Sequence, residues 1–153
     1  MSGIRLAVNT AEQALSAATE KTLIQVIAAA NHRVKVLGWG IFFDGVSTTA
    51  EPVQVRVARQ TTAIGGTPTS NNPVKKDVSV DETVQTTATI YGGSPTEPTT
   101  TDVYDVIEVH PQTGYRIFYP LGEELLIAGG GRLGILATAP AVVNARVQVD
   151  LEE

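Results

Sequence analysis

The sequence predicts an all-β domain, and three observations lead to that class. Threonine and valine each occur nineteen times among the 153 residues, and β-branched side chains suit a pleated, half-buried surface. Fourteen glycines and eight prolines supply turns. Apolar and polar residues alternate with period two in several short segments separated by brief connections. Together these features are typical of one domain built as a β-sandwich or β-barrel.

Residues 1–20 are the ambiguous part of the chain, and we expect them to form an N-terminal arm or a loosely packed segment. The string TAEQ resembles a helix capping box, so a short helix over residues 10–19 is the alternative. The β-sandwich domain is expected to cover residues 21–153. Its first predicted strand is the β-branched segment KTLIQVIA at 21–28.

The next two strands are predicted by clean alternation. RVKVLGWGIFFDG places Val34 and Val36 on one face and Lys35 on the other, and it ends in an Asp-Gly turn signal. In PVQVRVARQ the valines at 53, 55 and 57 face inward, while the polar residues between them lie outside that stripe. Pro52 stands at the strand start, where its missing N–H does least harm.

Two stretches differ in amino-acid composition from these strands. Residues 61–81 and 92–102 are rich in Thr, Ser, Pro, Gly and Asn and carry almost no core residues, so they are predicted to be exposed loops. A strand is expected between them at 82–91. Loops of this length in a compact domain usually carry function, and we expect a contact surface here.

The last third of the chain is again dense in strand signals. DVYDVIEVHP alternates, and ELLIA, RLGILATA and AVVNARVQVDLEE follow with short connections. YRIFYPL has large residues on both faces, with Tyr115, Ile117 and Tyr119 on one side and Arg116 and Phe118 on the other. A strand of this kind is covered by a second sheet or buried in a subunit interface.

The string GGGRLG at 129–134 matches the dinucleotide-binding pattern G-x-G-x-x-G. That motif must open a helix inside a βαβ unit, but only 19 residues follow Gly134, and they alternate with period two beyond Pro140. We therefore predict that Gly129, Gly130 and Gly131 make a tight connection between two antiparallel strands, with positive φ. Gly134 is expected to mark a bulge or the close approach of another backbone.

Reactive side chains are few. There is no cysteine, and the two histidines, His32 and His110, fall in a turn and at a strand end. A zinc site needs three or four protein ligands, and no G-x-S-x-G nucleophile elbow occurs. Adjacent carboxylates such as Glu123 and Glu124 point to opposite faces of a strand. We expect no enzymatic activity, no cofactor and no metal.

Charge and hydropathy narrow the expected partners. The net charge is −5 and the only adjacent basic pair is Lys75-Lys76, so we expect no nucleic-acid partner. No stretch approaches the roughly 20 apolar residues of a membrane span. Glu12 and Gln13 interrupt any apolar core of a signal peptide. We expect a soluble protein made in a cytoplasm.

Three segments carry a resemblance to a known family: TLIQVIAAANHRVKVLGWGIFFDG, PVQVRVARQTT and VIEVHPQTGYRIFYPLGEELLIAGGGRLGILATAPAVVNARVQVDLEE. They resemble the capsid decoration (cement) proteins encoded among the head genes of tailed bacteriophages, over residues 21–60 and 103–153. The resemblance implies a jelly-roll-like antiparallel β-sandwich with an N-terminal arm and long Thr/Pro-rich loops. It also implies a homotrimer seated on the outer surface of the virion capsid, bound to the major capsid protein and stabilising the shell.

The same resemblance suggests where partners would be contacted. Such proteins commonly hold the major capsid protein with an arm or with loops, and the apolar residues of the arm are the candidates here. Large residues of the YRIFYP stretch, or Trp39, are the candidates for packing between subunits. The expected contact residues are Ile4, Leu6, Val8, Trp39, Tyr115, Phe118 and Tyr119.

Two alternatives stay open. Trp39 is also expected in the core, because a lone tryptophan on a strand is commonly buried. The alternative to a decoration protein is a phage fibre domain or a carbohydrate- or receptor-binding module. It would use loops 61–81 and 92–102, with Trp39 or Tyr91 stacked on a sugar.

Overall fold

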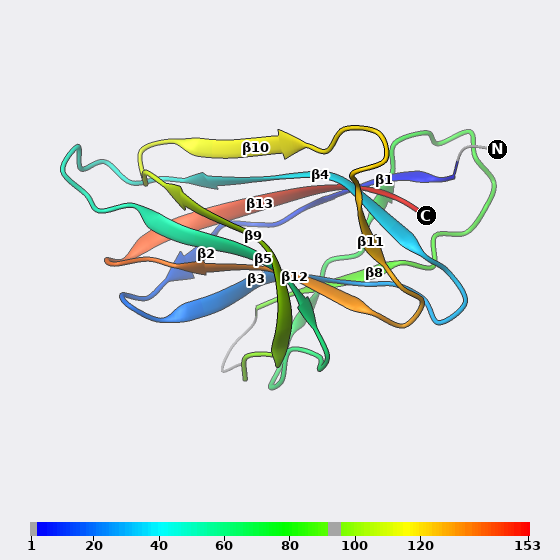
Figure 1. Cartoon of the computed structure of the whole chain (residues 1–153), viewed down its shortest axis with the longest axis horizontal. Helices are drawn as coiled ribbons and strands as arrows, with labels where there is room; N and C mark the ends of the chain where they lie inside the picture. The colour runs from blue at the N-terminus through cyan, green and yellow to red at the C-terminus, as the bar shows by residue number, and fades with distance from the viewer. Residues whose placement is uncertain (1–2, 92–95) are drawn as a thin grey trace.

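Two antiparallel sheets pack face to face in the structure, a computed structural model that describes residues 3–91 and 96–153 (Figure 1). The described residues form strands, turns and loops and no helix. The predicted antiparallel β-sandwich is therefore confirmed. In Figure 1 the two ends of the chain lie at the same end of the sandwich.

The first sheet has seven strands. Its central path runs in the order β10 (Gly114–Phe118), β4 (Val34–Phe43), β13 (Val143–Glu152), β1 (Arg5–Asn9) and β7 (Val74–Lys75). Two short strands extend it, β11 (Leu125–Ile127) beside β4 and β2 (Gln13–Leu15) beside β13.

The second sheet has six strands. They lie in the order β6 (Thr69–Ser70), β8 (Thr87–Ile90), β3 (Glu20–Ile27), β12 (Arg132–Thr138), β5 (Val53–Gln60) and β9 (Thr100–Val109). The strand expected at 82–91 is thus only four residues long, and the residues before it belong to a loop.

The core lies between the sheets and follows the predicted alternation. Val53, Val55 and Val57 on β5 are at most 1% exposed. On β4, Val34 and Val36 are fully buried, and the inward face then continues with Trp39 and Ile41. The inward-facing positions thus change from even to odd residue numbers along β4. The change coincides with an irregularity in the pairing of β4 with β13, between Asp150 and Leu151. A bulge adds one residue to a strand, which returns the apolar side chains to the core.

The expectation of an N-terminal arm or loosely packed segment is wrong for the described part of residues 1–20. β1 lies inside the seven-stranded sheet, paired with β13 on one side and with β7 on the other. Leu6 and Val8 on β1 are 0% and 2% exposed. The alternative helix over residues 10–19 is wrong as well, because residues 13–15 form β2. Both strands are stabilised by pairing with β13, at the other end of the chain.

The predicted loops are less exposed than expected. Ile64 and Pro98 are buried, and backbone hydrogen bonds join the two loops, from Gly65 N to Thr96 O and from Thr61 N to Thr99 O, each 2.9 Å long. The two segments therefore lie side by side. Residues 92–95, the first part of the predicted loop 92–102, are outside the described residues.

These loops meet a buried polar network on the six-stranded sheet. Gln25 Nε2 donates to Gln60 Oε1 (2.7 Å) and to Thr62 O (2.9 Å), and Gln60 Nε2 donates to Thr22 Oγ1 (2.9 Å). Thr22 in turn donates its hydroxyl to the carboxylate of Glu97, at 2.6 Å. Because buried amides are costly unless they are paired, the network specifies how the loops sit on the sheet.

The glycine run joins the two sheets rather than two paired strands. β11 belongs to the seven-stranded sheet and β12 to the six-stranded sheet, so the predicted connection within one antiparallel pair is wrong. Positive φ is confirmed at Gly130, which has φ 73°. A Cβ on Gly129 would lie 2.4 Å from the carbonyl oxygen of Ala30, so the turn packs tightly against the connection from β3 to β4.

Gly134 is a point of close approach, but its neighbour is a side chain and not a backbone. A Cβ at this position would lie 2.5 Å from both Cδ and Oε1 of Gln60. The irregularity in the pairing of β12 with β3 lies further on, between Ile135 and Leu136, where Leu23 of β3 is the extra residue. Gly134 therefore makes room for the buried amide network described above.

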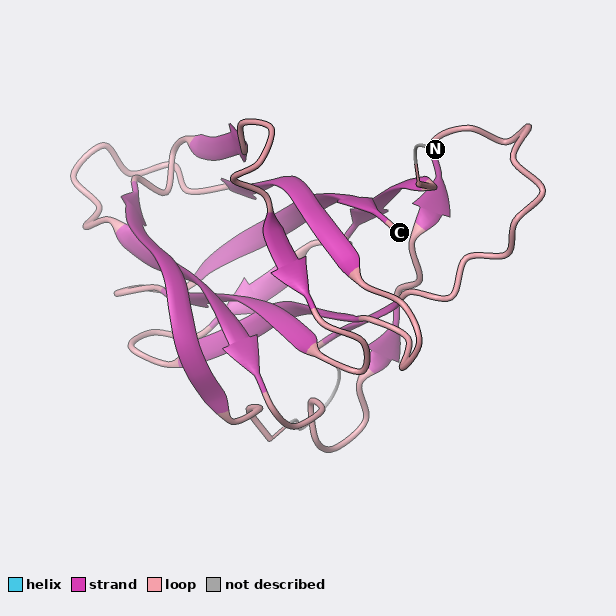
Figure 2. Cartoon of the chain, turned by 45° about the vertical axis from the view of Figure 1, so that its right-hand side comes forward, coloured by secondary structure: helices cyan, strands magenta, loops and turns pink. Residues whose placement is uncertain are grey.

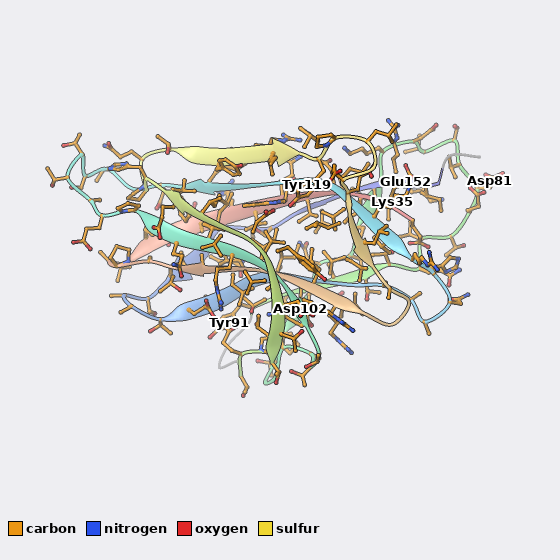
Figure 3. All side chains as sticks on the ribbon, viewed as in Figure 1. Lys35, Asp81, Tyr91, Asp102, Tyr119 and Glu152 are labelled. Atoms are coloured by element: carbon orange, nitrogen blue, oxygen red, sulfur yellow. The ribbon has the colours of Figure 1, made fainter. Side chains whose placement is uncertain are left out.

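The loop of residues 76–86 extends away from the body of the sandwich, as Figure 2 shows on its right-hand side. Figure 3 places Asp81 at the outer limit of this loop. The base of the loop is held by Glu153, whose carboxylate accepts hydrogen bonds from the backbone N–H groups of Gln85 (3.0 Å) and Thr86 (2.8 Å).

Acid is expected to release this loop. Burial by itself would raise the pKa of Glu153, but the hydrogen bonds from Thr86 and Gln85 outweigh it and hold the pKa below its ordinary value of 4.5. The contact is therefore present above that value and is lost as the pH falls through the lowered pKa. Between about pH 6 and about pH 3, hydrogen exchange at the amides of Gln85 and Thr86, corrected for intrinsic rates, should become faster.

Glu153→Gln is the matched control for this titration. Its amides should exchange faster than wild type near neutral pH, without the acid transition. A wild-type protein whose two amides keep constant protection over the range would contradict the assignment.

Candidate interaction surface

β9 is a ten-residue strand at the edge of the six-stranded sheet, and it exposes apolar side chains. Val103, Tyr104 and Val106 are 42%, 43% and 55% exposed. Among the described residues β9 pairs only with β5, so the hydrogen-bonding groups along its other edge are free. Long apolar edges of this kind favour association with another chain.

A neighbouring strand extends this apolar surface. Leu126 on β11 is 57% exposed, and it lines a small crevice of about 160 Å³ together with Tyr104, Arg59 and Leu133. We call Val103, Tyr104, Val106 and Leu126 the β9 surface. β9 is the last strand of the six-stranded sheet and β11 pairs with β4 in the seven-stranded sheet, so this surface takes side chains from both sheets.

A chain of hydrogen bonds joins the two sheets beside this surface. The indole Nε1 of Trp39 donates to the hydroxyl oxygen of Tyr119 at 3.0 Å, and the Tyr119 hydroxyl donates to Asp105 Oδ2 at 2.5 Å. Trp39 lies on β4, Tyr119 follows β10 (Figure 3), and Asp105 lies on β9. These two hydrogen bonds therefore fix β9 against the seven-stranded sheet.

The phenol of Tyr119 stays protonated at neutral pH. Burial, with the hydrogen bond to Asp105 as the next cause, raises the pKa of Tyr119 well above its ordinary value of 10.0. A neutral phenol can accept from the indole and donate to a carboxylate at the same time. Its role here is to hold the two sheets together.

Tyr119→Phe is expected to lower the free energy of unfolding by about 1–3 kcal/mol, because it leaves the buried indole N–H and the Asp105 carboxylate without a partner. Trp39 is the single tryptophan, so its fluorescence should change with the substitution. Chemical denaturation followed by that fluorescence measures both effects.

Tyr115→Phe is the matched control. The ring of Tyr115 lies 5.6 Å from that of Trp39, but its hydroxyl makes none of the side-chain hydrogen bonds found among the described residues. The Phe variant should therefore retain nearly all of the stability. Equal losses in the two variants would show that the hydrogen-bond chain contributes little.

The structure separates the seven predicted contact residues into three groups. Leu6, Val8 and Trp39 are at most 2% exposed and belong to the core, so predicting them as partner contacts was wrong. The alternative that Trp39 is a core residue is confirmed. Its ring is therefore not open to a sugar. Three others are half-buried against the core, and one is exposed. The half-buried residues are Ile4, Tyr115 and Tyr119, and the exposed one is Phe118.

Phe118 lies on the outer face of the seven-stranded sheet and is 56% exposed. Its ring covers Gly38 on β4, where a Cβ would lie 2.7 Å from Phe118 Cδ1. The guanidinium of Arg116 lies 4.7 Å from the centre of this ring and also binds the buried carboxylate of Asp150 at 3.0 Å. The predicted division of this strand into two faces is confirmed: Tyr115 packs against the core, and Arg116 and Phe118 lie on the opposite face.

Sequence reasoning missed the β9 surface. The alternation of DVYDVIEVHP predicts a strand, but it does not show that the strand is at a sheet edge. One signal was available, since Val103 and Val106 are three residues apart and period-two alternation cannot place both on the same face without a bulge. The pairing of β5 with β9 is in fact irregular near Ala58.

The described residues contain no group of three or more His, Asp and Glu side chains arranged to hold a metal ion. They also contain no helix long and apolar enough to cross a bilayer.

Comparison with models of protein families, with curated proteins and with solved structures found no significant match to this chain.

Proposed function

We propose that this chain is a structural virion protein that decorates and stabilises the outer surface of a bacteriophage capsid as a homotrimer. The observation that supports the proposal is the β9 surface, an apolar sheet edge held in place by the chain of hydrogen bonds through Tyr119. Such an edge suits permanent association between subunits.

The charges on β9 favour a ring over a two-fold dimer. The strand carries Asp102, Asp105 and Glu108 and no lysine or arginine. Two copies of β9 paired with each other would bring the carboxylates of both strands together. Within the described part of the chain only Asp102 of these has an ion-pair partner, Arg59 at 3.6 Å, so the pairing is unfavourable. A cyclic assembly avoids this, because it joins β9 to a different surface of the next subunit.

The proposed partner outside the trimer is the major capsid protein. A decoration protein that binds only the assembled shell stabilises that shell by mass action. The test is to add the purified protein to bare shells assembled from the major capsid protein of the same genome. We expect saturable binding at fixed lattice positions, and shells that resist heating better. Binding that does not saturate, or no binding, would exclude the function.

The sugar-binding alternative is less well supported. Its stacking residue Trp39 is in the core, and the ring of Tyr91 faces Lys21, whose Nζ lies 4.1 Å from the ring centre. A glycan array without binding, alongside saturable binding to shells, would remove this alternative.

A further inference from the structure

Three connections lie at the end of the sandwich away from the chain termini (Figure 1), and residues of all three line an open groove of about 460 Å³. They are the loop from β4 to β5, the turn from β9 to β10 and the turn from β12 to β13. This volume is in the range of sites that accept one or two side chains or a small ligand.

The groove is lined mainly by aliphatic side chains. Val46 and Val142 come from different connections and are 90% and 76% exposed. Val53, Pro111 and Val143 also line it and are buried in the sandwich. Two highly exposed valines in one groove form an apolar patch whose contact with water is unfavourable.

Hydrogen bonds between the connections hold this shape. Gly45 N donates to Pro111 O at 2.8 Å, and Gln112 Nε2 donates to Val46 O at 2.9 Å. Asn144 donates its backbone N–H and its side-chain amide to the two oxygens of Asp44, at 2.9 and 2.8 Å. These hydrogen bonds fix the connections that carry the two valines. Binding of a partner would therefore cost little conformational entropy in the loops.

The groove also carries negative charge. Asp44 and Glu51 line it, and neither forms an ion pair with a cation among the described residues. The side-chain and backbone hydrogen bonds from Asn144 hold the pKa of Asp44 below its ordinary value, so this group is ionised at neutral pH. An occupant that matches the groove is therefore aliphatic and carries a positive charge.

We propose that this groove binds a segment of another protein that presents an aliphatic side chain next to a lysine or arginine. The aliphatic side chain packs between Val46 and Val142, and the cation lies near the carboxylates of Asp44 and Glu51. The inference goes beyond capsid decoration and does not depend on it, because any partner with this local chemistry fits the groove.

The test is a titration of the full chain, with labelled valine methyl groups, by two blocked peptides followed by NMR. The peptides are acetyl-Val-Leu-Lys-Val-amide and acetyl-Val-Leu-Glu-Val-amide. We expect saturable shifts at the methyl groups of Val46 and Val142 with the lysine peptide, and much weaker ones with the glutamate peptide. The absence of saturable shifts at these methyl groups, or equal binding of the two peptides, would overturn the proposal.

Variants make the assignment specific. Val142→Ser is expected to weaken binding of the lysine peptide about fivefold, and Glu51→Gln about two- to fivefold. Both positions are exposed, so the rest of the spectrum should be unchanged. Val78→Ser is the control, because Val78 is 91% exposed but lies in the loop of residues 76–86. Binding that is unaffected by Val142→Ser, or weakened equally by Val78→Ser, would contradict the location.

Discussion

Replacing Gly134 with valine is expected to lower the free energy of unfolding by about 2–4 kcal/mol, although valine is intrinsically the better residue in a strand. The first added carbon would lie 2.5 Å from Gln60 Cδ, closer than real contacts allow. Gln60 is 2% exposed and is bonded to Gln25 and Thr22, so its amide cannot move without breaking buried hydrogen bonds.

A double-mutant cycle separates this clash from other effects of the substitution. Gln60→Ala alone loses the network but leaves space beside Gly134. In that background, Gly134→Val should cost much less than in the wild type, and thermal or chemical denaturation gives the coupling energy. If the two costs simply add, Gly134 is not there to accommodate Gln60.

The second large effect is expected on assembly. Substituting Val103 and Val106 together with lysine should dissociate the proposed trimer, with a loss of about 2–4 kcal/mol per interface. Lysine on an edge strand opposes the addition of another chain, because its charge would have to be desolvated. Both valines are at least 42% exposed, so the fold of the single chain should remain stable.

Sedimentation velocity measures this dissociation, and circular dichroism checks the fold of the variant. The matched control is Val78→Lys, which places the same charge on an exposed valine of the loop of residues 76–86. The control should keep the oligomeric state of the wild type. A double variant that stays assembled, or a control that dissociates as well, would remove β9 from the interface.

The core was predictable from the sequence because its signal is local. The valines of β5 and the alternating residues of β13 each mark a buried face within a few residues, and that face does not depend on which strand lies beside them. The placement of Phe118 on the face opposite Tyr115 followed from the same rule.

The errors arise where a residue's partner lies far away in the sequence. Leu6 is buried because β1 pairs with β13, and nothing in the first twenty residues shows that pairing. Gln25 and Gln60 form one network only after β3, β12 and β5 are placed side by side. Because of this network, the Thr-rich loops lie on the six-stranded sheet, whereas their composition alone predicts exposed loops.

The position of a strand within a sheet is the remaining unpredicted feature, and it decides the candidate site. Val57 and Val106 both belong to alternating segments, but Val57 faces the core and is fully buried, while Val106 lies opposite Arg56 on the outward face and is 55% exposed. The alternation does not show which face of this strand turns inward, nor that the strand stands at the edge of a sheet. The β9 surface therefore had to come from the structure.

The mass of the unaltered protein in solution tests the central claim most directly. Sedimentation equilibrium over a dilution series should give three times the chain mass of 16.1 kDa, and one chain mass for the variant with lysine at positions 103 and 106. A wild-type protein that sediments as a single chain at high micromolar concentration would contradict the claim that the β9 surface joins subunits.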